Sequence, residues 1–149
     1  MTIASDLDIG PYRLDMSIVG LEGLVEITPA EYKALPKTFK GEKIFKAPDV
    51  SFLGFSWNMV LGVVGGNVYK ISPSLMLQGK SQADGAAIKV LAYCKSKLGD
   101  PAQQQTGSFM WYTSDGNVIL QNLQTPLGFA INLFCTSRSV QSFKKRGWL

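Results

Sequence analysis

The stretch LGFSWNMVLGV, residues 53–63, decides the fold of this chain. Apolar residues occupy every second position of it: Leu53, Phe55, Trp57, Met59, Leu61 and Val63. Such alternation predicts a β-strand with one buried face, because successive side chains point to opposite sides of a sheet. The turn Gly65–Asn67 follows, and Val68–Ser72 is predicted to be a second strand that ends before Pro73.

A similar pattern recurs about fifty residues later. Asp115-Gly116 separates two apolar runs, at 109–112 and 118–120, and so predicts a second hairpin. Residues 124–128 form the next turn, before an alternating strand over 129–135. Neither glycine turn leads into a helix, as a phosphate-binding loop would, so both are interpreted as turn chemistry.

Helical patterns lie between and around these strands. Residues 81–98 carry an amphipathic stripe, with Ser81 as the predicted N-cap, Asp84 completing a capping box and Gly99 as the stop. Residues 28–36 and the basic segment 137–149 predict shorter helices. The expected fold is a single α+β domain over 1–149. It has an antiparallel β-meander sheet, one long central helix packed on a face, and short N- and C-terminal helices, with a loop at 102–107.

Charge is distributed unevenly along the chain. Residues 1–31 hold six acids and one base, whereas the remainder holds five acids and fourteen bases, giving a net charge of +4. One interpretation is that the acidic segment folds across the basic body. The other is an exposed basic C-terminal surface that attracts an acidic partner or nucleic acid.

The sequence contains no histidine. This excludes Ser-His-Asp and Cys-His nucleophile systems and mixed Cys-His zinc sites, and the two cysteines are too few for a four-thiolate site. We therefore expect no catalytic residue, no metal and no cofactor, although an enzyme that uses carboxylates alone is conceivable. Cys94 and Cys135 are expected to be buried thiols at the helix–sheet interface; a disulfide is the alternative if the protein is exported.

Two groups of residues are candidate sites. Lys144, Lys145, Arg146 and Trp148 form a basic, aromatic tail that could bind a partner. Trp57, Tyr69 and Tyr93 could line a pocket between the helix and the sheet. In addition, Phe52, Val60, Val64 and Phe134 are predicted on faces opposite the main core pattern. Such a second apolar face must be covered by helices, by a twin subunit or by a partner.

The preferred function is accordingly a non-catalytic protein-binding or adaptor domain, chaperone-like or dimeric. The alternatives are a small-ligand-binding protein or enzyme with a helix–sheet pocket and, third, nucleic-acid binding through the basic C-terminal region. No apolar run approaches the length of a membrane span, and the first ten residues do not resemble a signal peptide. A cytoplasmic protein is expected, with an exported form that has lost its signal as the alternative.

Overall fold

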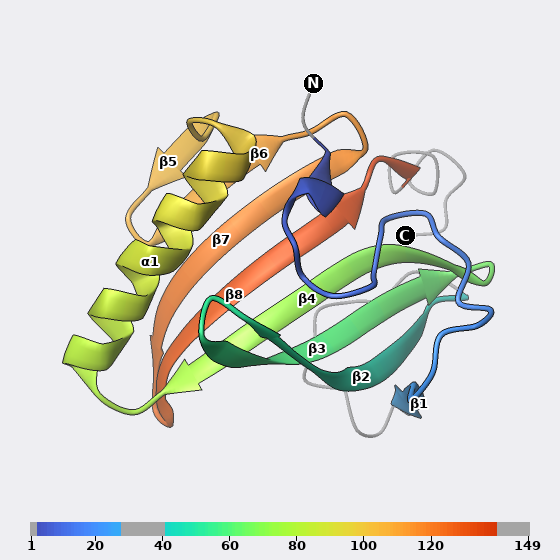
Figure 1. Cartoon of the computed structure of the whole chain (residues 1–149), viewed down its shortest axis with the longest axis horizontal. Coiled ribbons are helices and arrows are strands. Elements are labelled where there is room, and N and C mark those ends of the chain that lie inside the picture. Colours follow the sequence, from blue (N-terminus) through green and yellow to red (C-terminus); the bar gives the residue numbers. More distant parts are fainter. Residues whose placement is uncertain (1–2, 28–40, 140–149) are drawn as a thin grey trace.

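The structure is a computed structural model that describes residues 3–27 and 41–139. These residues form one antiparallel sheet of eight strands, with strand order β1-β2-β3-β4-β8-β7-β6-β5 (Figure 1). The strands are β1 (Val25–Ile27), β2 (Lys43–Phe52), β3 (Phe55–Val64), β4 (Asn67–Leu77), β5 (Gln103–Gln105), β6 (Ser108–Tyr112), β7 (Gly116–Thr125) and β8 (Gly128–Ser137). A short 3-10 turn, η1 (Ala4–Asp6), and the helix α1 (Lys80–Leu98) complete the described structure. The predicted α+β class with an antiparallel sheet is confirmed.

The sheet consists of two four-stranded meanders that meet at β4 and β8, and α1 connects them. The two glycine turns hold different places in these meanders. Gly65–Asn67 leads from the third strand to the fourth in the first meander, whereas Asp115-Gly116 leads from the second to the third in the other. The two turns therefore use similar residues but do not mark equivalent positions of a structural repeat.

The predicted strand over 53–63 begins two residues later than expected. Leu53 and Gly54 both have positive φ, 56° and 79°, and form the tight connection between Phe52 and Phe55, which pair directly. Hairpin loops of two residues favour positive φ at both positions because this geometry matches the twist of the strands. Along the rest of the strand the alternation is confirmed, since Trp57, Met59 and Leu61 are fully buried.

Strand β4 continues through Pro73 to Leu77, so the prediction that it ends before Pro73 was wrong. Proline lacks the N–H group that a central strand donates to its neighbours. Pro73 lies in a gap of the pairing between β4 and β8: Ile71 pairs with Cys135 and Ser74 with Asn132, and the two residues between them in β4 have no partner in β8.

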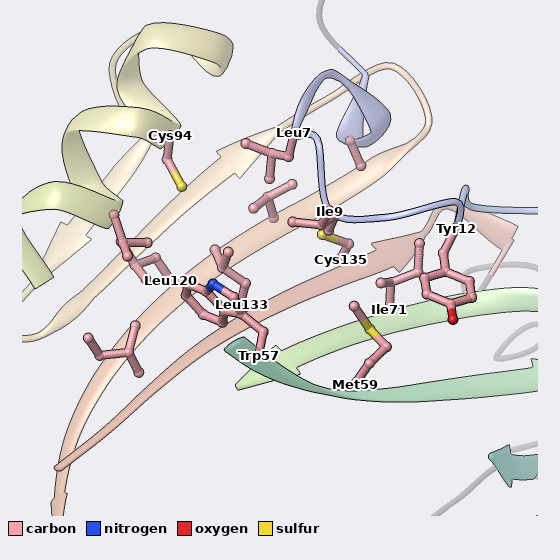
Figure 2. Close-up of a cluster of buried hydrophobic side chains, with 14 of the residues drawn as sticks. Leu7, Ile9, Tyr12, Trp57, Met59, Ile71, Cys94, Leu120, Leu133 and Cys135 are labelled. Carbon is pink, nitrogen blue, oxygen red and sulfur yellow. The ribbon is translucent and has the colours of Figure 1, made fainter. Parts of the chain in front are cut away.

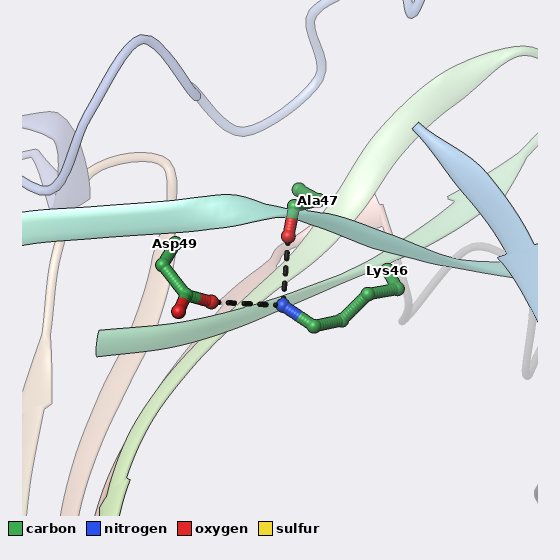
Figure 3. A network of polar contacts seen from close by, with 3 residues as sticks. All are labelled: Lys46, Ala47 and Asp49. Carbon is green, nitrogen blue, oxygen red and sulfur yellow. Dashed lines mark hydrogen bonds and ion pairs between the residues drawn. The ribbon is translucent and has the colours of Figure 1, made fainter. Parts of the chain in front are cut away.

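Strand β2 contains a local irregularity where its register with β3 shifts between Ala47 and Val50. The ammonium of Lys46 binds this point, donating to the Ala47 carbonyl at 2.8 Å and to Asp49 Oδ1 at 3.0 Å (Figure 3). A side chain of the same strand therefore supplies hydrogen bonds at the point where the pairing of β2 with β3 is interrupted.

Helix α1 starts at Lys80, with Gly79 as an N-cap that offers no side-chain hydrogen bond, so the predicted Ser81 cap was wrong. Asp84 instead pairs with Lys80, at 2.8 Å. The C-terminal prediction is confirmed: Gly99 has φ 82° and its N–H donates to the Lys95 carbonyl. The helix buries Ala83, Ala86, Val90, Cys94 and Leu98 against the sheet.

Two other predicted elements differ from the structure or lie outside it. The expected loop at 102–107 contains the edge strand β5, which pairs with β6. The helix predicted at 28–36 lies outside the described residues, as does the basic segment beyond residue 139, while Ser137 belongs to β8.

The N-terminal segment packs on the same face of the sheet as α1. Figures 1 and 2 show this segment in front of the sheet near β8 and β4. Leu7, Ile9, Tyr12 and Leu14 join the core that α1 and the sheet form. Hydrogen bonds hold the backbone, since Val68 accepts from the N–H of Asp15 and donates to the Met16 carbonyl. The acidic segment thus folds onto the body, through apolar burial and hydrogen bonds.

Candidate functional site

Within residues 3–27 and 41–139, helix and loop segments cover one face of the sheet. Alpha-helix α1 and the N-terminal segment lie on the inner face, which carries the core. No described element packs on the opposite face, here called the outer face. It consists of the outward positions of β3, β4, β8, β7 and β6.

The register of the strands places the outer-face side chains in rows. An apolar row contains Phe134, Ile119 and Met110, in which Phe134 pairs with Ile119 and Ile119 pairs with Met110. Val60 continues the row beyond Ser72, its partner in β4, and all four apolar residues are half-buried. A polar row runs beside it through consecutive partners: Asn58, Ser74, Asn132, Gln121 and Ser108.

Exposed apolar side chains flank these rows. Met76 and Leu123 stand on either side of Ala130 and are 48% and 47% exposed. Tyr112, at the far side of the face, is 54% exposed, while its neighbour Trp111 is buried. Trp111 and Tyr112, adjacent in β6, therefore point to opposite faces of the sheet.

Charge is sparse on the outer face, although Lys46 of β2, which pairs with Asp49, lies beside it as the cross-strand partner of Val60. On the outward positions of these five strands the only charged side chain is Lys70, whose ammonium lies over the Phe134 ring, 5.6 Å from its centre. This contact partly screens the charge, because a cation is attracted to the face of an aromatic ring. The surface is therefore apolar and hydrogen-bonding rather than ionic.

The structure brings together two of the three residues predicted to line a pocket. Trp57 stacks on Phe52, with ring centres 4.5 Å apart, and its Nε1 donates to the Phe52 carbonyl. Tyr93 reaches the same Phe52 ring at 6.1 Å, and its hydroxyl accepts from the N–H of Asp8. Phe52 therefore packs toward the inner core, which corrects its predicted place on the opposite face.

Tyr69 lies on the other side of the sheet. Its ring occupies the space above Gly62, where an added Cβ would lie 2.8 Å from Tyr69 Cε1, and its hydroxyl donates to the Glu42 carboxylate. Burial, followed by the neighbouring Glu42, raises the pKa of the Tyr69 hydroxyl. A register shift between Gly62 and Val63 separates Tyr69 from the inner face that holds Trp57.

The remaining predicted site residues, Lys144, Lys145, Arg146 and Trp148, lie outside the described residues. Of the predicted second apolar face, Val60 and Phe134 are on the outer face and Val64 is buried. Ile119 was not predicted to lie on this face. The alternation of buried Val118 and Leu120 around Ile119 could have revealed it.

Cys94 and Cys135 are both buried and free. Burial raises the pKa of each thiol to about 12, and for Cys135 the charges of Cys94 and Asp115 add to the effect. Both thiols are thus protonated at neutral pH. As predicted, they lie in the core between α1 and the sheet (Figure 2).

Comparison with known proteins gives no assignment: no family model, no curated protein and no solved structure matches the chain. The part of the chain that the structure describes contains no group of three or more Cys, Asp or Glu residues that could hold a metal ion. It also contains no helix long and apolar enough to cross a membrane.

Proposed function

We propose that this protein is a non-catalytic protein-binding domain, and that its outer face binds the same face of a second copy. The apolar row of Val60, Phe134, Ile119 and Met110, half-exposed on a nearly uncharged sheet face, carries the proposal.

The composition of the outer face favours a protein as its occupant. Interface centres are depleted in charged residues and enriched in aromatic residues and methionine. The outer face combines Phe134, Tyr112, Met76 and Met110 with one lysine, Lys70, and Lys46 of β2 borders it beside Val60. A nucleic acid would require cations, so nucleic-acid binding depends on the basic C-terminal tail, and stays a prediction.

The dimensions of the face also suit a stable interface. Four of the strands have ten or eleven residues and β6 has five. With about 4.8 Å between strands and roughly 3.3 Å per residue, the four cover about 19 Å by 33 Å and β6 adds about 5 Å by 17 Å. Together this is roughly 700 Å², close to the area of about 800 Å² that each partner contributes to a standard interface.

A second copy is favoured over another protein because the face complements itself. The polar row consists of Asn, Gln and Ser, whose side chains can both donate and accept hydrogen bonds. Two identical faces related by a twofold axis can therefore satisfy one another while their apolar rows meet. The single Lys70 avoids strong like-charge repulsion between the copies.

A cytoplasmic location is part of the same proposal. The free thiols of Cys94 and Cys135 support it, because reducing compartments keep cysteines unpaired.

Sedimentation velocity of the full chain over a wide concentration range tests the proposal. We expect a concentration-dependent dimer, and we expect Ile119→Lys to shift it to monomer by placing two charges in the interface. The matched control is Ile88→Lys, at a 71% exposed position of α1, which should leave association unchanged. A monomer at all concentrations, or equal effects of both variants, would reject a second copy as the occupant.

A further inference from the structure

The side chains of the outer face are arranged almost symmetrically about β8. Of the five strands that form this face, β8 is the middle one, with β4 and β3 on one side and β7 and β6 on the other (Figure 1). The register gives outward residues of β4 and β7 a shared partner in β8. The two halves of the face can therefore be compared position by position.

The polar row has the same kinds of side chain on both sides of β8. Its centre is Asn132, which pairs with Ser74 of β4 and with Gln121 of β7. Asn58 and Ser108 form the two ends. A twofold axis along β8 exchanges Ser74 with Gln121 and Asn58 with Ser108. Each hydroxyl of one copy then faces an amide of the other, and both groups can donate and accept hydrogen bonds.

The exposed apolar residues beside the polar row follow the same symmetry. Ala130 of β8 pairs with Met76 on one side and with Leu123 on the other. These two side chains are exposed to nearly the same extent, 48% and 47%. The axis along β8 places Met76 of each copy opposite Leu123 of the other copy, so that two contacts cover four exposed apolar side chains.

The lysine of the outer face also has a suitable counterpart. Thr136 of β8 pairs with Lys70 of β4 and with Asn117 of β7. The axis therefore places Lys70 opposite Asn117 of the second copy, whose side-chain oxygen can accept a hydrogen bond from an ammonium. The symmetry is broken at Ser72, whose counterpart is the half-buried Ile119.

The other twofold axis in the plane of the face crosses the strands along the polar row. It would place the exposed Met76 opposite the hydroxyl of Ser72 and Leu123 opposite Ile119. Met76 would then lose its apolar counterpart. The axis along β8 is favoured because it matches both exposed apolar residues with each other.

We propose that the twofold axis of the dimer runs along β8, so that β8 packs on β8 of the second copy and β4 packs on β7. This inference rests on the proposed function and adds the residues that recognise the second copy. Asn132 lies on the axis, Ser74 faces Gln121, and Met76 faces Leu123. The strands of the two sheets are then nearly aligned, as in a β-sandwich.

Thiol crosslinking in mixtures of two single variants tests the position of the axis. Facing sheets lie about 10 Å apart, too far for a direct disulfide, so the short bifunctional reagent dibromobimane is used. Met76→Cys is mixed with Leu123→Cys enriched in nitrogen-15, and mass spectrometry identifies crosslinks between the two kinds of chain. The native thiols are buried and do not react. We expect this mixture to crosslink, and we expect little product from Met76→Cys alone, whose two copies lie about 10 Å apart across the axis.

The matched control is Ile119→Cys mixed with Leu123→Cys. Ile119 is on the same strand and face as Leu123 but four residues, about 13 Å, away along the strand, so this mixture should not crosslink. Crosslinking of the control, or none between Met76→Cys and Leu123→Cys, in a protein that sediments as a dimer would overturn the β8 axis and leave the proposed function standing. A chain that sediments only as a monomer would reject both.

Charged variants test the same contact without a reagent. Met76→Lys should weaken self-association at least about tenfold, because its ammonium faces Leu123 of the second copy. Adding Leu123→Glu should recover most of this loss, whereas adding Ile119→Glu, which gives the same net charge, should not. Equal recovery in the two double variants, or recovery in neither, would contradict the assigned contact.

Discussion

Replacing Asn122 by leucine should stabilise the protein. Asn122 Oδ1 is buried without a hydrogen-bond partner in the described residues, and Asn122 lines a hollow of about 150 Å³ between the start of α1 and the β7–β8 hairpin. A buried polar group left unsatisfied costs about 1–3 kcal/mol, whereas an apolar group of the same shape carries no such cost. Leucine has nearly the same size, and the hollow leaves room for its methyl groups.

The expected gain in the free energy of unfolding is about 1–3 kcal/mol. For a domain of this length each 1 kcal/mol shifts the melting temperature by about 2–4 °C, so the variant should melt several degrees higher. Urea denaturation followed by circular dichroism measures the same change as a higher midpoint at unchanged slope.

The control for this experiment is Gln82→Leu, which replaces another side-chain amide by leucine at an exposed position of α1, away from the outer face. It should change stability by no more than about 0.5 kcal/mol, as surface substitutions usually do. A loss of more than about 1 kcal/mol in Asn122→Leu would refute the reasoning, because it would show that Oδ1 makes a hydrogen bond in the folded protein.

Three further outcomes follow from the structure. Gly116→Ala should destabilise by about 3 kcal/mol or more, because the new Cβ would lie 1.9 Å from the Thr136 carbonyl oxygen, whereas Gly85→Ala, with open space around it in α1, should stabilise by about 0.5–1 kcal/mol; thermal melts measure both. The pKa of the Cys94 and Cys135 thiols is raised from 9.0 to about 12, so the folded state retains protons that the unfolded state releases. Stability should therefore fall between about pH 9 and 12, by roughly 1.4 kcal/mol per pH unit for each thiol, and a pH series of urea melts in which Cys94→Ala shows the wild-type slope would contradict this. Thiol-reactive reagents at pH 8 should modify both cysteines only after unfolding, as mass spectrometry of native and denatured samples can establish.

Much of the fold follows from local patterns in the sequence. The alternation from Phe55 to Val63, the glycine turns and the stop at Gly99 each depend on neighbouring residues, and the structure retains them. Elements fixed by distant partners were missed. The three glutamines of β5 carry no strand signal of their own and are ordered by pairing with β6.

Tertiary contacts also overrode local rules. Pro73 predicts a strand end, yet β4 continues because β3 pairs with it on the other side, Met59 opposite Pro73. Ser81 has the chemistry of an N-cap, but the N-cap is Gly79, two residues earlier, and the helix begins at Lys80.

The candidate surface was predictable in part. The second apolar face could be predicted from Val60 and Phe134, because each stands between two core residues in its strand. Its continuity with Ile119 and Met110 could not, because it depends on the register between β6, β7 and β8. The place of Tyr69 could not be predicted either, since the register shift beside it changes which face the side chain occupies.

The measurement that tests the outer-face proposal most directly is paramagnetic broadening between two copies of the chain. One sample carries Ser56→Cys, on the exposed outer side of β3, with a nitroxide spin label on the new thiol and nitrogen at natural abundance. It is mixed with wild-type protein enriched in nitrogen-15. The native thiols are buried and do not react with the spin label. We expect the outer-face amide signals of the nitrogen-15-enriched copy to broaden around Gln121 and Asn132. This broadening should disappear when the nitrogen-15-enriched copy carries Ile119→Lys. Broadening confined to α1 or the N-terminal segment, or none at all at millimolar concentration, would contradict it.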